Sequence, residues 1–143
     1  MAQGFNPPGV WNEPDKTYSQ GVVQHEGRTI HITGQIAWDA DNQLVGKGDV
    51  AAQARQCLKN IETILAEVGG VMEDIVSMTI FCTDPDQIAE ISQVRSEFFK
   101  TETAPVSIFI QAAALVHPDW LVEMIPIAVV PDERYREPSR PAS

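Results

Sequence analysis

Two hydrophobic periods of different length stand next to each other in the middle of the chain. Across residues 50–68, apolar side chains recur at steps of three and four, which is the spacing of one face of an α-helix. Asp49 can cap the first turn of this helix, and Gly69-Gly70 can end it. Residues 75–82 then alternate with a period of two, which is the spacing of a β-strand. A helix followed directly by such a strand predicts a helix packed on one face of a sheet.

The flanking segments repeat these two periods. Strand-like runs are found at residues 18–26, 29–36, 105–112 and 121–130. The first two runs are joined at Glu26-Gly27-Arg28, which predicts a β-hairpin because Gly27 can adopt positive φ. A second helix is predicted to begin at Asp84-Pro85. The order β-β-α-β-α-β-β indicates an α+β domain with both helices on one face of the sheet.

The length and composition of the chain fit one domain. It has 143 residues, of which 43% are apolar. Residues 1–17 and 131–143 are rich in proline and poor in apolar side chains, so they are expected to form an irregular N-terminal arm and a flexible C-terminal tail around a domain at residues 18–130. No apolar run approaches the roughly 18 residues of a membrane span, and the first residues lack a basic segment with an apolar core. We expect a cytoplasmic protein without a membrane partner.

A sheet with both helices on one face leaves its other face uncovered. The large side chains expected on that face are Phe81, Phe109, Ile125 and Ile127. A broad apolar sheet face usually meets another subunit, so the sequence predicts a homo-oligomer without fixing its order.

Several kinds of chemistry lack their usual sequence pattern. The formal net charge is −10 and the ten Lys and Arg residues are scattered, which argues against nucleic acid as a partner. His25, His31 and His117 fall in three different segments, so their spacing predicts no metal site. No phosphate loop or dinucleotide fingerprint is present. We expect no metal and no cofactor.

Glu123 interrupts the apolar run LVEMIPIAVV at residues 121–130. Its neighbours at a period of two are Leu121, Ile125, Ile127 and Val129, so it shares a strand face with apolar side chains only. Removing a carboxylate from water is costly unless it finds hydrogen-bond donors. The pattern leaves three interpretations open: a sheet edge facing solvent, a structural hydrogen bond, or an active-site cavity.

Six segments together resemble the Rid family of reactive-intermediate deaminases, long labelled endoribonuclease L-PSP or translation inhibitor. They are YSQGV at Tyr18, ITGQI at Ile32, DVAAQARQCLKNIETILAEVGG at Asp49, DIVSMTIFCTD at Asp74, SEFF at Ser96 and LVEMIPIAVV at Leu121. The resemblance covers residues 18–130, nearly the whole predicted domain, and the order of the motifs is specific.

The resemblance implies a chorismate-mutase-like fold that assembles as a homotrimer, with small-molecule clefts between neighbouring subunits. The best-studied members hydrolyse enamines and imines such as 2-aminoacrylate, releasing ammonia and a 2-keto acid, without a metal or an organic cofactor. In that pattern an arginine binds the substrate carboxylate and a glutamate positions or activates water. Carried over by position, Glu123 matches the catalytic glutamate, Thr33 matches the hydroxyl residue before Gly-Gln, and Tyr18 matches the aromatic residue of the first strand.

Three positions depart from the family pattern. Val106 stands where the family has its arginine, in a stretch that reads Ala-Pro-Val-Ser here. Ser92 takes the place of the usual asparagine, and Ile108 stands where active deaminases often have cysteine. An arginine that binds a carboxylate in a shielded cleft contributes about 1.5 to 3 kcal/mol, and valine supplies none of it. These substitutions predict a poor 2-aminoacrylate deaminase.

Three functional interpretations follow. The first is a hydrolase of a neutral or hydrophobic enamine or imine, in which Glu123 acts on water. The second is a trimer that binds a small metabolite or regulates a partner without catalysis. The third is the endoribonuclease or translation inhibitor of the older label, against which the net charge of −10 argues.

Overall fold

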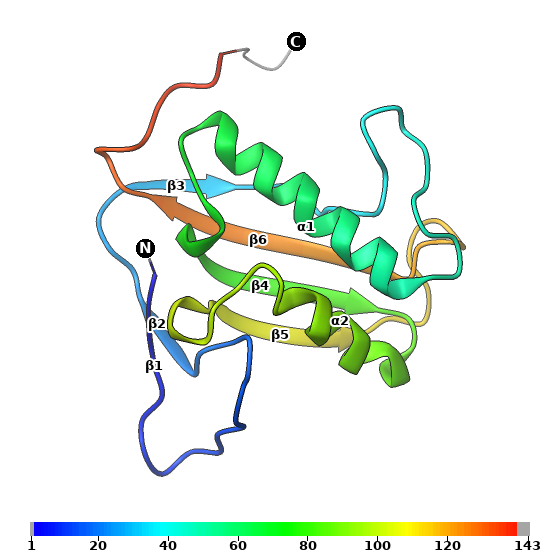
Figure 1. Ribbon diagram of the computed structural model, residues 1–143, viewed down its shortest axis with the longest axis horizontal. Coiled ribbons are helices and arrows are strands. Elements are labelled where there is room, and N and C mark those ends of the chain that lie inside the picture. The colour runs from blue at the N-terminus through cyan, green and yellow to red at the C-terminus, as the bar shows by residue number, and fades with distance from the viewer. Residues whose placement is uncertain (1, 140–143) are drawn as a thin grey trace.

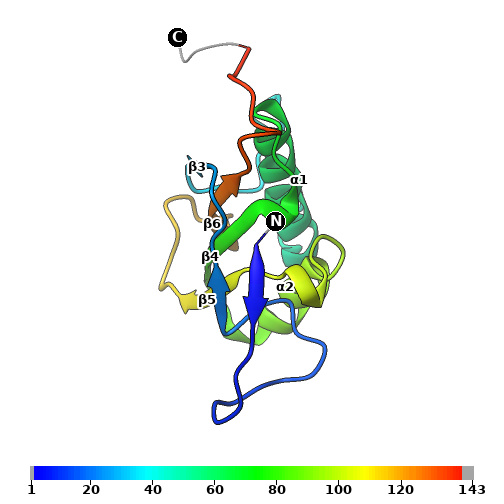
Figure 2. The same cartoon turned by 90° about the vertical axis from the view of Figure 1, so that its left-hand side faces the viewer.

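The computed structural model describes residues 2–139 and consists mainly of a four-stranded sheet with two helices on one face (Figure 1). The strands follow the order β3 (Arg28–His31), β6 (Val122–Val130), β4 (Ile75–Cys82) and β5 (Val106–Gln111). Helices α1 (Val50–Glu67) and α2 (Ile88–Arg95) lie across the same side of this sheet, as the edge view also shows (Figure 2). The predicted single α+β domain with both helices on one face is confirmed.

α1 forms at the predicted place and for the predicted reasons. The Asp49 side chain accepts a hydrogen bond from the Ala52 amide at 3.1 Å, and Gly69 follows the helix with a φ of +80°. The buried face of α1 packs on the helix-covered face of the sheet, and its apolar members are Val50, Ala54, Cys57, Leu58, Ile61 and Leu65. Single 3₁₀ turns at Met72–Asp74, Pro85–Gln87 and Thr101–Thr103 connect the later elements.

The predicted hairpin between residues 18–26 and 29–36 is wrong. β2 (Gly21–Val23) pairs with β1 (Gln3–Phe5) in a separate two-stranded sheet, and β3 pairs with β6. Gly27 lies directly before β3 and beside the end of β6. A Cβ at position 27 would stand 2.3 Å from the carbonyl oxygen of Val130. The glycine is therefore required by the close approach of β6 and not by a hairpin turn. β1 also gives regular structure to part of the arm that was expected to be irregular.

The segment after β6 is bound to the domain as far as the structure describes it. The Arg134 guanidinium donates to both carboxylate oxygens of buried Asp74, at 2.6 and 2.9 Å, and to the carbonyl of Gly69. Arg136 donates to the carbonyls of Ala66 and Glu67 at the end of α1. Residues 131–139 are thus attached to the domain by side-chain hydrogen bonds, although they form no helix or strand. Residues 140–143 lie outside the described part of the chain.

The face of the sheet opposite the helices carries apolar side chains from three strands. Phe81, Ile125 and Ile127 lie on it as predicted, whereas Phe109 does not. Phe109 pairs with buried Ile80 and therefore points toward the helices. The residues of β5 on the uncovered side are Val106, Ile108 and Ile110. We call this surface the open face.

Candidate functional site

Glu123 lies on the open face near the start of β6. It stands directly opposite Phe81 of β4, and its neighbour along the same face is Ile125. The side chain is partly buried. Among residues 2–139, the Glu123 carboxylate has no hydrogen bond or ion pair with another side chain or with the backbone.

The chain after β3 passes directly beside this carboxylate. The amide and carbonyl of Gln35 exchange hydrogen bonds with those of Met124, at 2.8 and 3.0 Å. The exchange places Gly34 against Glu123, because a Cβ at position 34 would lie 2.4 Å from Glu123 Oε1. Thr33 precedes Gly34 and is exposed. We call Thr33, Gly34 and Glu123 the Glu123 group.

A second set of predicted site residues gathers at the start of β5. Ser19 donates its amide proton to the Pro105 carbonyl at 2.9 Å and its hydroxyl proton to the Ala104 carbonyl at 2.7 Å. These bonds place Tyr18 near Val106, which is partly buried on the open face. We call Tyr18 and Val106 the Val106 group.

The Tyr18 ring is held from the N-terminal arm. Its hydroxyl donates to a carboxylate oxygen of Glu13 at 3.2 Å, and the Lys16 ammonium lies 5.0 Å from the ring centroid. Burial raises the pKa of Tyr18, and the Glu13 carboxylate raises it further. The phenol therefore stays protonated at neutral pH and can donate a hydrogen bond.

The Glu123 group and the Val106 group lie at opposite ends of the open face. Val106 pairs with Ser77, and Ser77 pairs with Ile127, four residues along β6 from Glu123. Four residues along a strand and two strand spacings across the sheet separate Val106 from Glu123 by roughly 15 Å. Within one chain, these residues do not form a single small-molecule site.

The two remaining predicted residues occupy different layers. Ile108 lies on the open face opposite Thr79 and is 53% exposed. Ser92 belongs to α2, on the helix-covered side of the sheet, and is partly buried. Ser92 therefore does not share the open face with Glu123 and Val106.

Two arginines of the matching region have partners away from the open face. Arg28 stacks over the Tyr135 ring, with its centroid 5.1 Å away, and lies 3.7 Å from Asp132. Arg55 makes two hydrogen bonds to the Glu97 carboxylate, at 2.9 and 2.8 Å. Neither of them is paired with Glu123.

Arg95 is fully buried between α2 and β5, on the helix-covered side. It donates to the Thr17 carbonyl at 2.9 Å and to the Ser107 hydroxyl at 2.6 Å, and it lies over the rings of Phe99 and Phe109. Burial lowers its pKa to about 10, so the guanidinium remains charged at neutral pH. Arg95 thus connects Thr17, which precedes Tyr18, to Ser107 of β5. Ser107 follows Val106 directly, but its side chain lies on the helix-covered side of the sheet.

Sequence reasoning missed two residues that shape these groups, Gly34 and Arg95. The need for a residue without a side chain at position 34 becomes visible only once Glu123 is placed in three dimensions. For Arg95 a signal was present, because it follows Ile91 by four residues and therefore belongs to the buried face of α2.

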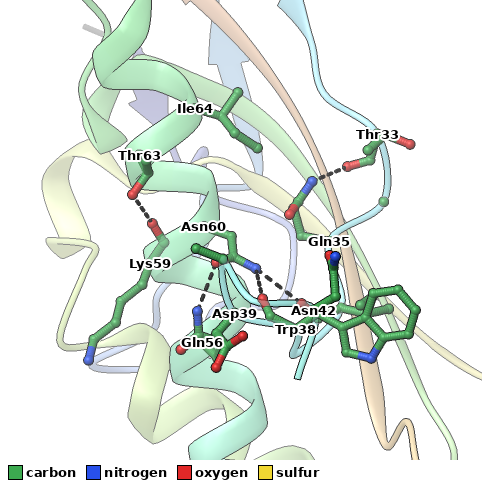
Figure 3. Close-up of a pocket in the computed structure, with 13 residues that line it drawn as sticks. Thr33, Gln35, Trp38, Asp39, Asn42, Gln56, Lys59, Asn60, Thr63 and Ile64 are labelled. Atoms are coloured by element: carbon green, nitrogen blue, oxygen red, sulfur yellow. Dashed lines mark hydrogen bonds between the residues drawn. The ribbon is translucent and has the colours of Figure 1, made fainter. Parts of the chain in front are cut away.

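A hollow of about 560 Å³ borders the Glu123 group on the side of α1 (Figure 3). The Asn60 amide donates to the carbonyls of Ile36 and Trp38, at 3.2 and 2.9 Å, and so fixes the loop after Gln35 to α1. Trp38 meets Trp120 edge to face, with ring centroids 5.4 Å apart. The loop that carries Thr33 and Gly34 is thus supported from behind by hydrogen bonds and by aromatic packing.

Both groups fall inside the part of the chain that matches a known family. A family model described as Endoribonuclease L-PSP matches residues 11–130. The chain belongs to the endoribonuclease L-PSP family, also called the Rid family. Glu123 and Val106 are therefore residues of a Rid protein.

Individual members of the Rid family support this assignment. A RutC family protein from Pyrococcus abyssi is 33% identical over 116 residues, which are 81% of this chain and 88% of the relative. The crystal structure of YyfB from Yersinia pestis, a Rid protein of unknown function, superposes with a TM-score of 0.84 at 30% identity and covers 90% of this chain and 98% of that one. The Rid protein YyfA from Yersinia pestis superposes with a TM-score of 0.67 at 32% identity, over 79% of this chain and 87% of that one.

Two further properties bear on the class of this Rid protein. Within residues 2–139, no three His, Cys, Asp or Glu side chains are grouped closely enough to hold a metal ion. None of the described helices has the length and apolar character needed to span a membrane.

Proposed function

We propose that this Rid protein forms a homotrimer and hydrolyses a small enamine or imine that carries no carboxylate, in clefts between neighbouring subunits. The observation that carries the proposal is the position of Glu123, a carboxylate without a partner among the described residues, on an apolar sheet face from which the family arginine is missing. Such a group can accept a proton from water, whereas the surrounding surface offers no partner for a substrate carboxylate.

The separation of the two groups supports an assembled site. The Glu123 group and the Val106 group lie roughly 15 Å apart in one chain, which is too far for both to touch one small ligand. If the open face of one subunit meets that of its neighbour, the Glu123 group of one chain can face the Val106 group of the next. Such an arrangement also covers exposed apolar side chains such as Ile108 and Ile110.

The proposed reaction is the addition of water to a C=N bond. Glu123 accepts a proton as the water oxygen bonds to the imine carbon, and it passes this proton to nitrogen. The second water proton reaches nitrogen as the C–N bond breaks, so the products are a carbonyl compound and ammonia. The apolar side chains around Glu123 bind the carbon skeleton, and Val106 and Ile108 leave an acidic substrate without an anchor.

The direct test is the rate at which the protein removes imines in competition with semicarbazide. An amine oxidase generates imines without a carboxylate, and an amino-acid oxidase generates 2-imino acids. We expect the native protein to accelerate loss of the first class at least tenfold more than loss of the second, and Glu123→Gln to abolish the acceleration. Equal or greater acceleration with 2-imino acids would contradict the proposal, and so would unchanged turnover in Glu123→Gln.

Mixed assemblies test whether each cleft is shared between chains. Glu123→Gln disables one group, and Val106→Trp fills the other. Co-refolding equal amounts of the two inactive variants gives trimers in which the variants are mixed at random. About a quarter of the clefts should then be active, because they combine the Glu123 group of a Val106→Trp chain with the Val106 group of a Glu123→Gln chain. The control is the double variant co-refolded with Glu123→Gln, which should stay inactive. Absence of recovery in mixed trimers would place the whole site in one chain.

A non-catalytic trimer that binds a small metabolite is the second candidate. It is favoured by the two apolar side chains, Val106 and Ile108, at positions where deaminases of the family carry an arginine and often a cysteine. Native mass spectrometry of the freshly purified protein tests it. A retained metabolite, together with no imine turnover, would favour the binding function over the hydrolase.

A further inference from the structure

We propose that the ligand of the Glu123 group is a cation, either a protonated imine or an ammonium compound without a carboxylate. This inference rests on the proposed function and names the charge class of its substrate. Two features carry it, the surroundings of the Glu123 carboxylate and the positions of the basic side chains.

The carboxylate of Glu123 forms no ion pair with the described residues of its own chain. It is partly buried, and its nearest neighbours on the open face are Phe81 and Ile125. A carboxylate that is partly removed from water without a partner is destabilised, and a ligand of opposite charge relieves that cost. The same site disfavours an anion, which would approach Glu123 against charge repulsion.

Phe81 adds a second feature that favours a positive charge. It stands directly across from Glu123 in the ladder of β4 and β6, so both side chains project from the open face. The face of an aromatic ring attracts ammonium and iminium groups through its quadrupole. The open face around Glu123 therefore presents a carboxylate and an aromatic side chain on adjacent strands to a small organic cation.

Three arginines have partners away from Glu123. Arg95 is buried on the helix-covered face, and Arg134 is bound to Asp74. Arg136 donates to backbone carbonyls at the end of α1. These guanidinium groups are held by their own partners and do not neutralise the Glu123 carboxylate.

Three lysines also lie elsewhere. Lys16 donates to the side-chain oxygens of Asn6 and Asn12 in the N-terminal arm. Lys47 lies 3.8 Å from Asp119. Lys59 lines the hollow behind the loop but extends along α1 away from Thr33 (Figure 3).

A histidine also lies on the open face. His31 pairs with Ile127, four residues from Glu123 along β6, and is exposed. That separation corresponds to about 13 Å, so a His31 imidazole does not neutralise the Glu123 carboxylate of its own chain.

The overall charge acts in the same direction. A formal net charge of −10 on 143 residues gives the surface a negative potential, which raises the local concentration of cations and lowers that of anions. The electrostatic field and the local chemistry therefore select the same sign of ligand.

The reaction of a cationic substrate balances without a further reactant. A protonated imine and one water molecule give a ketone or aldehyde and an ammonium ion. The water oxygen forms the new C–O bond, both water protons pass to nitrogen with Glu123 as the carrier, and the C–N bond breaks with its electron pair on nitrogen. A reaction that oxidises amines to imines is the class that supplies such a substrate.

Binding of three molecules of matched shape tests the charge class independently of catalysis. The probes are isobutylammonium, isobutyramide and isobutyrate, and dissociation constants are obtained by NMR titration of the full-length protein at low salt. We expect isobutylammonium to bind at least about tenfold more tightly than isobutyramide, with isobutyrate weakest. Glu123→Gln should bring the ammonium and amide affinities together.

A matched variant separates the local carboxylate from the net charge. Glu62→Gln removes the same charge from an exposed position on α1 and should leave the preference for ammonium intact. Tighter binding of isobutyrate, or a preference that survives in Glu123→Gln, would overturn the inference. Preference for ammonium without imine turnover would refute the hydrolase and leave the inference standing. Turnover of imines without that preference would support the hydrolase and refute the inference.

Discussion

Gly34 leaves the space that the Glu123 carboxylate occupies. A Cβ at position 34 would lie 2.4 Å from Glu123 Oε1 and 3.1 Å from the carboxyl carbon. The hydrogen bonds between Gln35 and Met124 fix the backbone on which this contact depends. The glycine before Gln35 thus determines where the only charged side chain of the LVEMIPIAVV segment points.

Gly34→Ala should therefore impair the site more than the fold. The carboxylate is the end of a flexible side chain and can swing aside, so we expect the free energy of unfolding to fall by less than about 1 kcal/mol. Ligand affinity or turnover should fall at least tenfold because the carboxylate is displaced. A double-mutant cycle with Glu123→Gln is the check: if Gly34→Ala lowers affinity equally when Glu123→Gln is already present, the effect does not pass through the carboxylate.

Val106→Arg should give the open face an affinity for carboxylates. Val106 is partly exposed, so the longer side chain can extend from β5 without entering the core. We expect isobutyrate to bind at least about tenfold more tightly than to the native protein, and loss of 2-imino acids to accelerate. Gln93→Arg adds the same charge at an exposed position on α2, on the other side of the sheet, and serves as the control. A folded, oligomeric Val106→Arg variant with unchanged isobutyrate affinity would show that Ser92, Ile108 or the shape of the cleft decides instead.

The buried guanidinium of Arg95 should be replaceable by an apolar side chain of similar length. Its Nε and Nη1 have no hydrogen-bond partner in the described structure, so part of the cost of burying the charge is not recovered. In urea denaturation, Arg95→Met should have a free energy of unfolding within about 1 kcal/mol of the native value or above it. Arg95→Ala should lose about 3 kcal/mol because it leaves a cavity. If both variants lose the same amount, the bonds to Thr17 and Ser107 matter more than volume.

The ion pair between Arg134 and Asp74 should anchor the C-terminal segment. The Asp74 side chain is 0% exposed, and removing its cationic partner leaves a buried carboxylate with fewer hydrogen-bond donors. We expect Arg134→Gln to lower the free energy of unfolding by about 2 kcal/mol. Arg28→Gln, which breaks the exposed contact with Asp132, should change it by less than about 0.5 kcal/mol. Equal effects of the two variants in urea denaturation would contradict the anchoring role.

Cys57 should make the protein less stable at alkaline pH. Burial in the core, with a smaller contribution from the Glu123 carboxylate, raises the pKa of the Cys57 thiol to about 12. The ordinary thiol pKa is about 8.5, so above that pH the unfolded chain loses the proton while the folded chain keeps it. The contribution to stability is complete below about pH 8.5 and is lost as the pH rises toward about 12.

Urea midpoints between about pH 8.5 and about pH 10 measure this effect. The slope of the free energy of unfolding against pH should be more negative in the native protein than in Cys57→Ala, by up to about 1.4 kcal/mol per pH unit. Identical slopes would show that the thiol is not protected from ionisation. The native thiol should also resist alkylation at about pH 8, because the thiolate is the reactive form.

Local patterns in the sequence were sufficient for both helices, for the strands of the four-stranded sheet and for their two layers, but not for β1. The steps of three and four in α1 and the alternation in β4 each depend on neighbours a few residues away, and side-chain direction follows directly from those periods. At Gly27 such local reasoning gave the wrong result. Its presence suggested a hairpin, but its reason is the carbonyl of Val130, which is far away along the chain. Phe109 was misplaced because register between strands depends on partners that a single segment does not contain.

The sequence by itself determined an α+β domain of the Rid family with Glu123 on an apolar strand, and it predicted that Val106 replaces the family arginine. Only the tertiary structure decided that Gly34 makes room for the carboxylate, that Arg95 is buried on the opposite side of the sheet, and that Glu123 and Val106 lie at opposite ends of the open face. The physical reason is that strand periodicity fixes which face a side chain occupies, whereas pairing between distant strands fixes how far apart two side chains on that face lie.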